Sequence, residues 1–388
     1  MHKKLPIVLV CVILLSILLN PVVSVSAKEI IYGVSLTIKS IVLFLLPFII
    51  FSLLFNTFSK LVGNGAALVC LIFGVICTSN FINTFVSHYV GKLFYCLDFN
   101  IKGAVISGQV IKPYFILELP NVIKNEFALL GGVLSGACAP FILSRDLLQL
   151  VQSFLDKLVK KLFGVISTLI PLFIVGYVIK CASEGSLPVL IRSYSFIFVV
   201  FIAYASLYTI LFYLFSTGWN WSRCFTYLSN MLPAFLTGIS TISSALTMPV
   251  TMMSVEKNVK NKELAGSVVS ATVNIHLLGD CIAIPLLAYS LMKHFGMAEP
   301  TLYSYFIFTI FFVIAKFSVA AVPAGGIIVM TPILEKYLGF TTDMSSLIIA
   351  IYIIFDPLIT GFNVLGNGAL AKVIDNLYTK FLLRKKSV

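Results

Sequence analysis

Residues 231–255 read MLPAFLTGISTISSALTMPVTMMSV, an apolar stretch with helix-breaking and polar residues at its centre. The stretch is apolar enough to enter a bilayer, yet its middle carries Gly238, a run of Ser and Thr, and Pro249. Irregular backbone at membrane depth is tolerated only where it is buried in protein or lines a cavity. The pattern therefore predicts a re-entrant helical hairpin at about residues 229–258 rather than a plain spanning helix.

A second stretch of the same kind covers residues 302–338, with the turn at AVPAGG, residues 321–326. Between the two hairpins, residues 264–292 predict one long helix, and residues 343–378 predict another after them. Two interrupted segments in corresponding positions are the best sequence pointer to the binding site of a transporter.

The whole chain has the composition of a membrane protein. Of its 388 residues, 59% are hydrophobic and only 11% are charged, against about a quarter charged in a soluble domain. Apolar runs of about 18 residues span a bilayer as helices. We expect an all-α polytopic membrane protein with about eight transmembrane helices and two re-entrant hairpins, the first six at residues 5–26, 36–58, 66–90, a broken fourth within 103–143, 162–181 and 190–216.

Basic residues predict the orientation. The net charge of +12 comes from Lys and Arg scattered at the ends of apolar runs, which argues against nucleic-acid binding. Short cytoplasmic loops carry excess Lys and Arg, so both termini are expected in the cytoplasm of a bacterial-type inner membrane. The alternative at the N-terminus is a secretory signal peptide, because Ser24-Val25-Ser26-Ala27 follows a basic start and an apolar run.

Neither a metal centre nor an enzyme is indicated. The eight cysteines include no C-x-x-C pair and no His at zinc spacing, so we expect no metal and no disulfide framework. The chain also lacks a G-x-S-x-G elbow and an H-E-x-x-H pair. No cofactor is expected beyond a coupling ion, Na⁺ or H⁺.

Four motifs in order across residues 232–367 resemble the dicarboxylate/amino acid:cation symporters of the glutamate-transporter type. The segment LPAFLT (232–237) with SSALTMPVTM (243–252) is similar to that family's first hairpin, and ATVNIH (271–276) resembles the opening of its N-M-D-G-T signature. AVPAGG (321–326) looks like the G-x-P-G-x-G tip of the second hairpin. DPLITGFNVLGN (356–367) resembles D-x-x-R-T-x-x-N-V-x-G-D in the last helix.

The resemblance implies a homotrimer in membrane lipid that carries a small-molecule substrate by an elevator motion. Scaffold and trimerisation helices would be residues 1–62 and 100–186, and the transport domain residues 63–99 and 187–388. In the family, the residue matching Asp356 holds the substrate's amino group and the one matching Asn363 its carboxylate. The implied substrate site comprises Ser243, Ser244, Thr247, Ala324, Gly325, Gly326, Asp356, Thr360 and Asn363.

This chain departs from the family at charged positions. The family's Arg, which pairs with acidic side chains, is Ile359 here, so a neutral amino acid is the expected substrate. Two Asp carboxylates at the family's sodium sites correspond to His276 and Asn367, so sodium dependence is expected to be altered or lost. His276 and Asp280 lie four residues apart on one expected helical face, which allows coupling to protons. The ion-coupling candidates are Thr78, Ser79, Asn274, His276, Asp280, Lys316 and Asn367.

Several alternatives stay open at this point. Asp356 could be a structural carboxylate that caps broken backbone, His276 could be satisfied by its neighbours, and Lys316 could pair with Asp280 or reach the membrane interface instead of replacing a bound cation. Loss of three charged positions also fits a sensor or structural protein of this fold that no longer transports, and a dicarboxylate symporter is a third reading.

Overall fold

A computed structural model describes residues 5–62, 66–96, 110–120, 123–185, 187–319 and 324–380. These residues form α-helices and connecting segments, with no β-strand among them. Within these residues, five helices are long and apolar enough to cross a membrane: Val25–Ser59, Leu71–Tyr95, Arg145–Ser183, Tyr194–Ser216 and Thr342–Tyr378. The chain is therefore an all-α polytopic membrane protein, as its composition predicts.

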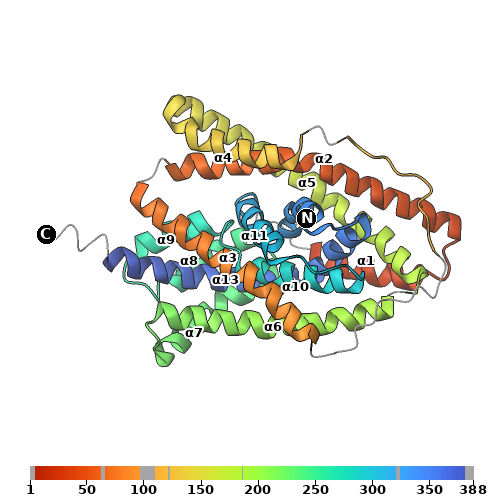
Figure 1. Ribbon diagram of the computed structural model, residues 1–388. Helices are drawn as coiled ribbons and strands as arrows, with labels where there is room; N and C mark the ends of the chain where they lie inside the picture. The colour runs from red at the N-terminus through yellow and green to blue at the C-terminus, as the bar shows by residue number, and fades with distance from the viewer. Residues whose placement is uncertain are drawn as a thin grey trace.

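The helices pack in two groups (Figure 1). The first helix group consists of α1 (Leu5–Leu19), α2 (Val25–Val62), α4 (Asn125–Ile142) and α5 (Arg145–Ser183). The second helix group consists of α3 (Ala66–Cys96), α6 (Leu187–Ser216), α7 (Trp221–Thr241), α8 (Ser244–Val255), α9 (Lys262–Thr272), α10 (Leu278–His294), α11 (Leu302–Lys316), α12 (Gly325–Leu338) and α13 (Thr342–Tyr378).

Glycines allow the first helix group to pack closely. A Cβ added at Gly136 of α4 would lie 2.7 Å from the carbonyl oxygen of Phe55 in α2. A Cβ at Gly176 of α5 would lie 2.7 Å from the carbonyl oxygen of Ile31, also in α2. Helices in a membrane associate through such small residues, because lipid offers no hydrophobic force between them. Both positions require glycine for this close approach.

Two pairs of helices confirm the hairpin pattern of the second helix group. Helix α7 ends at Ile242, which has a left-handed backbone (φ 49°), and α8 begins after Ser243, so the chain reverses there and α7 packs on α8. Helices α11 and α12 pack on one another in the same way. Residues 320–323 of the second turn lie outside the described residues. The last helix, α13, agrees with the sequence prediction to within one residue.

Two expectations from the sequence were wrong. The expected helix 264–292 is broken into α9 and α10 by an irregular segment at residues 273–277. Among the described residues of the expected fourth span, those of α4 are helical, and residues 110–120 run extended beside α2 (Figure 1). Side chains of α2 satisfy that extended backbone, since the N–H of Leu119 donates to Ser40 Oγ at 2.7 Å.

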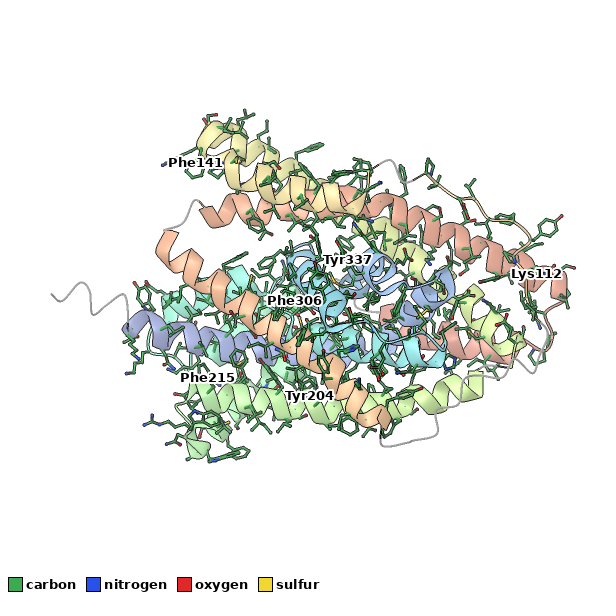
Figure 2. The ribbon with its side chains drawn as sticks, in the orientation of Figure 1. Lys112, Phe141, Tyr204, Phe215, Phe306 and Tyr337 are labelled. Carbon is green, nitrogen blue, oxygen red and sulfur yellow. The ribbon has the colours of Figure 1, made fainter. Side chains whose placement is uncertain are left out.

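Apolar side chains cover the outer surface, as expected for a protein that faces lipid. Phe141 at the end of α4 is 81% exposed and lies at the outer edge of the molecule in Figure 2, and Phe215 at the end of α6 is 60% exposed. Side chains of this size would be costly in water, whereas hydrocarbon accommodates them.

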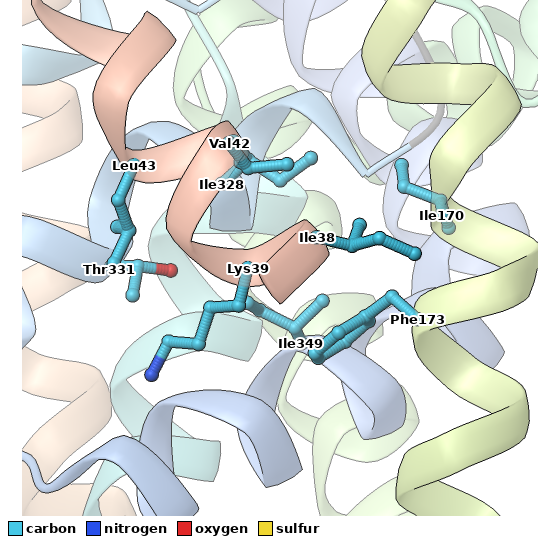
Figure 3. A pocket seen from close by; sticks show the side chains of 9 residues that line it. All are labelled: Ile38, Lys39, Val42, Leu43, Ile170, Phe173, Ile328, Thr331 and Ile349. Atoms are coloured by element: carbon cyan, nitrogen blue, oxygen red, sulfur yellow. The ribbon is translucent and has the colours of Figure 1, made fainter. Parts of the chain in front are cut away.

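Ion pairs and an apolar crevice join the two helix groups. Lys180 of α5 pairs with Asp343 of α13 at 2.7 Å. Lys39 of α2 donates to the carbonyl oxygen of Thr342 at 3.0 Å and lies 3.5 Å from the carboxylate of Glu335. Figure 3 shows the adjacent crevice, in which the amino group of Lys39 points away from the apolar walls formed by residues of α2, α5, α12 and α13. The polar contacts therefore lie beside an otherwise apolar interface.

Candidate functional site

Asp356 holds the start of α12. Its side chain is 6% exposed, and Oδ2 accepts a hydrogen bond from the N–H of Ala324 at 2.7 Å. Ala324 has a left-handed backbone (φ 60°) and no side-chain cap of its own, so the carboxylate supplies the missing N-terminal partner. The hydroxyl of Thr360 donates to the other oxygen, Oδ1, over a longer 3.5 Å. Asp356 is thus a capping carboxylate, and its Oδ1 is held more loosely than its Oδ2.

Asn363 holds the start of α10. Its Oδ1 accepts from the N–H of Gly279 at 2.8 Å and, at 3.4 Å, from that of Asp280. The first N–H groups of a helix have no partner within the helix, so this amide satisfies donors that the break at residues 273–277 would leave unpaired. The spacing of Asp356, Thr360 and Asn363 puts all three on one face of α13, as predicted, and all three are buried.

The serine-rich tip of the first hairpin is buried and internally bonded. Ser243 Oγ accepts from the N–H of Leu246 at 3.4 Å and caps α8. The hydroxyl of Thr247 lies 2.9 Å from the hydroxyl of Thr241 and donates to the carbonyl oxygen of Ser243. Ser244 is 4% exposed. The hairpin packs on α13: a Cβ added at Gly238 of α7 would lie 3.2 Å from the side chain of Val364 in α13.

A buried ion pair lies next to the start of α12. Lys316 Nζ is 3.0 Å from Asp280 Oδ2, and the two side chains are 0% and 2% exposed. The hydroxyl of Tyr352 donates to Asp280 Oδ1 at 2.6 Å. A Cβ added at Gly326 would lie 2.5 Å from that carboxylate, so glycine is required there. The pairing of Lys316 with Asp280 was one of the alternatives left open by the sequence.

His276 lies in the break between α9 and α10, away from the helical face of Asp280 that the sequence predicted. Its Nε2 is 3.0 Å from the hydroxyl of Ser79 in α3, and Asn80 of α3 donates to the carbonyl oxygen of Ile275 at 2.9 Å. The expectation that His276 and Asp280 share one helical face is therefore wrong, because the helix that would align them is interrupted. Side chains of α3 instead satisfy the irregular segment.

Asn367 links the break to α13. Its Oδ1 accepts from the hydroxyl of Thr272 at 3.0 Å, and its Nδ2 donates to the carbonyl oxygen of Asn363 at 3.0 Å. Asn274 is half-buried, and its Oδ1 has no hydrogen-bond partner among the described residues. The predicted ion-coupling residues therefore form separate contacts: Ser79 bonds to His276, Asn367 bonds to Thr272, and Lys316 pairs with Asp280.

A cavity of about 450 Å³ that is open to the surface lies next to this break, between α3, α6 and α13. It is lined mainly by apolar side chains, and Thr78, Ser79 and Tyr208 contribute hydroxyls to its wall. Thr78 is exposed into this region, whereas Ser79 is buried against His276. Of the predicted site residues, the cavity reaches Thr78 and Ser79 and leaves Asp356 and Thr360 in a different part of the second helix group.

The sequence reasoning missed Tyr352 and the buried polar residues of α3 beyond Ser79. Tyr352 carries no local signal, because one tyrosine in an apolar helix is ordinary. The polar residues of α3 do carry one, since they recur at helical spacing within a run that is otherwise apolar. Among the described residues, no cluster of three or more His, Cys, Asp or Glu is placed to hold a metal ion.

Comparison with known proteins finds relatives of this chain among membrane transporters. A sequence model described as Sodium:dicarboxylate symporter family matches residues 127–377. Excitatory amino acid transporter 1 of Bos taurus is 25% identical over 274 residues, which cover 68% of this chain and 49% of that protein. Neutral amino acid transporter A of Bos taurus is 31% identical over 167 residues, 41% of this chain and 30% of that protein. The chain spans about half the length of the curated relatives it matches over most of its own length.

Proposed function

The chain belongs to the Sodium:dicarboxylate symporter family, and on that premise we propose that it is a secondary transporter of a small neutral amino acid. The family is one of transporters and not of enzymes. The observation that carries the proposal is the last helix, where Asp356, Thr360 and Asn363 share a buried face and an isoleucine occupies the position between them. Their arrangement offers a carboxylate to an amino group and no cation to an acidic side chain.

The preference for a neutral substrate rests on Ile359. The residue is 0% exposed, and a Cβ at Gly279 of α10 would lie within 3.0 Å of its backbone, so Ile359 is firmly packed against α10. An aliphatic residue cannot supply the two-pronged hydrogen bonding with which Arg holds a carboxylate. A second carboxylate on the substrate would be left buried without a partner. The likeness to Neutral amino acid transporter A supports the same preference.

The sodium dependence is altered or lost. Sodium requires oxygen ligands, and the side chains at the positions identified from the sequence do not fit it. His276 is hydrogen-bonded to Ser79, Asn367 Oδ1 already accepts from Thr272, and Lys316 places an ammonium group beside Asp280. Neutral oxygens that are already bonded are poor replacements for carboxylates, and a fixed positive charge repels a second cation.

The two helix groups support an elevator arrangement. We assign residues 1–62 and 100–186 to a scaffold that forms a homotrimer, and residues 63–99 and 187–388 to a transport domain that moves against it in the cytoplasmic membrane. The crevice beside Lys39 lies between α2 and α5 on one side and α12 and α13 on the other, which is where such a movement would take place.

Uptake into proteoliposomes tests the proposal. Purified protein is expected to take up neutral amino acids, with aspartate and glutamate as weaker competitors, and to keep this activity when choline replaces sodium at fixed pH. Preferred uptake of dicarboxylates would show that the role given to Ile359 is wrong. A collapse to background in choline would show that sodium sites survive on other ligands.

A second candidate is a sensor or structural membrane protein of the same fold. The internal pairing of Lys316 with Asp280, and of Asp356 with the backbone of Ala324, favours it, because both bonds hold the second hairpin without a ligand. Absence of uptake for every amino acid and carboxylate, together with a ligand-induced rise in melting temperature, would support this candidate.

A further inference from the structure

Helix α3 carries a row of buried polar side chains. Residues at positions i, i+4 and i+8 share one face of a helix, and on α3 that face consists of Ser79, Asn80, Asn83, Thr84, Ser87 and His88, none more than 7% exposed. We call this set the α3 polar row. Burying polar side chains within a membrane span costs free energy, so such residues are usually functional. The α3 polar row packs towards α10 and α11 in the interior of the second helix group.

The row does not satisfy its own hydrogen-bonding groups. Asn83 Nδ2 donates to the carbonyl oxygen of Ser79, and Ser87 Oγ donates to that of Asn83. In the described part of the chain, however, Asn80 Oδ1, Asn83 Oδ1 and His276 Nδ1 have no partner. Exchanging O and N in either amide would leave an unpaired atom all the same. Buried polar atoms of this kind are normally satisfied by ordered water.

One end of the row meets a group of charged residues near the surface. His88 stacks on Tyr305 with ring centroids 4.0 Å apart and lies edge-on to Tyr289 at 4.9 Å. One turn further along α3, Lys92 pairs with Glu299 at 2.7 Å, and both side chains are partly exposed. Lys293 pairs with the same carboxylate. These three charged side chains are partly exposed and lie at this end of the row.

The other end of the row meets His276. Ser79 Oγ lies 3.0 Å from His276 Nε2 and also lines the cavity between α3, α6 and α13. Neutral groups face the imidazole from the other elements: the ring of Phe212 in α6 at 6.0 Å, and Gly366 of α13, where an added Cβ would lie 3.4 Å away. The nearest charged residue along the chain, Asp280, is engaged by Lys316 and Tyr352.

We propose that the α3 polar row holds a file of ordered water molecules that joins the charged group at Lys92 and Glu299 to His276. The distance along α3 from Ser79 to Lys92 is about 20 Å at a rise of about 1.5 Å per residue, a large part of the membrane thickness. The file gives a histidine that is fully buried in protein a path to solvent protons. Its use in coupling transport to protons rests on the function proposed above, whereas the presence of the water does not.

Hydroxyl-radical footprinting of the full-length protein in lipid nanodiscs tests the file directly. Brief X-ray radiolysis makes radicals from water, and these oxidise side chains beside bound water even when they are buried. The matched reference is Tyr213, which is also 0% exposed and whose hydroxyl is bonded to the carbonyl oxygen of Leu365. His276 is expected to be oxidised well above Tyr213. Oxidation of His276 no faster than Tyr213 would overturn the proposal.

Variants locate the water along the row. Asn83→Leu is expected to reduce oxidation of His276 towards the level of Tyr213, and Asn83→Ser, which keeps a polar group, to preserve it. Ser87→Val provides a second block in case Asn83→Leu does not fold. The control is Ser52→Ala, at a buried serine of α2 whose hydroxyl donates to the carbonyl oxygen of Phe48 in the same helix. Unchanged oxidation in both blocking variants would assign the water to the adjacent cavity and overturn the file. No substrate is needed, so this result is independent of the uptake assay.

Discussion

Replacing Lys316 by methionine is expected to destabilise the folded protein strongly, because it leaves the carboxylate of Asp280 buried without its counter-charge. The two groups are 3.0 Å apart, with side chains 0% and 2% exposed, so solvent cannot take over the role of the ammonium group. Removing one partner of such a buried pair costs about 3–5 kcal/mol. Methionine has a similar length and volume, so loss of packing contributes little to this figure.

A second substitution separates the charge effect from other causes. In the double variant Lys316→Met/Asp280→Asn, the buried charge is gone, while the amide oxygen still accepts from the hydroxyl of Tyr352, which lies 2.6 Å from the carboxylate in the native protein. The double variant is therefore expected to recover most of the lost stability. Asp280→Asn alone is expected to be unstable as well, because it leaves the ammonium group of Lys316 buried without an anion.

Equilibrium unfolding in mixed micelles, with increasing SDS, measures the four free energies of this double-mutant cycle. The coupling free energy between Lys316 and Asp280 is expected to exceed about 3 kcal/mol, because each single variant leaves a buried charge unpaired at a cost of about 3–5 kcal/mol and the double variant does not. A cost below about 1 kcal/mol for Lys316→Met, the range of exposed pairs, would show that the pair is hydrated. A double variant no more stable than Lys316→Met would show that the charge is not the cause.

Three further predictions follow from single residues. Asp356→Asn is expected to keep the bond to Ala324 and the fold, but to weaken substrate binding roughly ten- to a hundredfold; wild-type affinity in a binding assay would exclude a role for the charge. Gly326→Ala should lower the melting temperature, since its Cβ would lie 2.5 Å from the carboxylate of Asp280, whereas Gly266→Ala, with nothing within 4 Å, should not. Hydrogen bonds from two lysines lower the pKa of Glu299 from its ordinary 4.5 to about 2. Ionised Glu299 therefore stabilises the folded state above about pH 4.5, and the difference in melting temperature between wild type and Glu299→Gln should shrink as pH falls from there towards 2; a difference that persists at low pH would refute this reasoning.

The first hairpin and the last helix are predictable from local sequence. Residues 231–255 combine apolar residues with Gly, Ser and Pro, and a cluster of those residue types within an apolar run favours an interrupted helix. The shared face of Asp356, Thr360 and Asn363 follows from the helical period alone. The membrane class follows from hydropathy in the same way. In each case the property depends on neighbouring residues along the chain.

The break between α9 and α10 could not be predicted in this manner. Residues 273–277 read VNIHL and contain neither Gly nor Pro, so nothing local argues against a continuous helix. The helix opens because partners from elsewhere satisfy the backbone groups that the break exposes: Asn80 of α3 bonds to the carbonyl oxygen of Ile275, and Asn363 of α13 bonds to the N–H of Gly279. Each bond joins residues more than 80 positions apart.

The sequence could identify polar residues of the site but not the partners to which they bond, and the reason is again that the partners lie far away along the chain. The family resemblance singled out His276 and Lys316, and helical spacing added Asp280, as polar groups inside the membrane, where each must find a partner. Which partner each one finds depends on how the helices pack: Lys316 bonds to Asp280 across two helices, and His276 bonds to Ser79 of α3 instead of to Asp280 in its own segment. A chain in lipid dictates that buried polar groups be satisfied, and the packing of distant helices selects the groups that satisfy them.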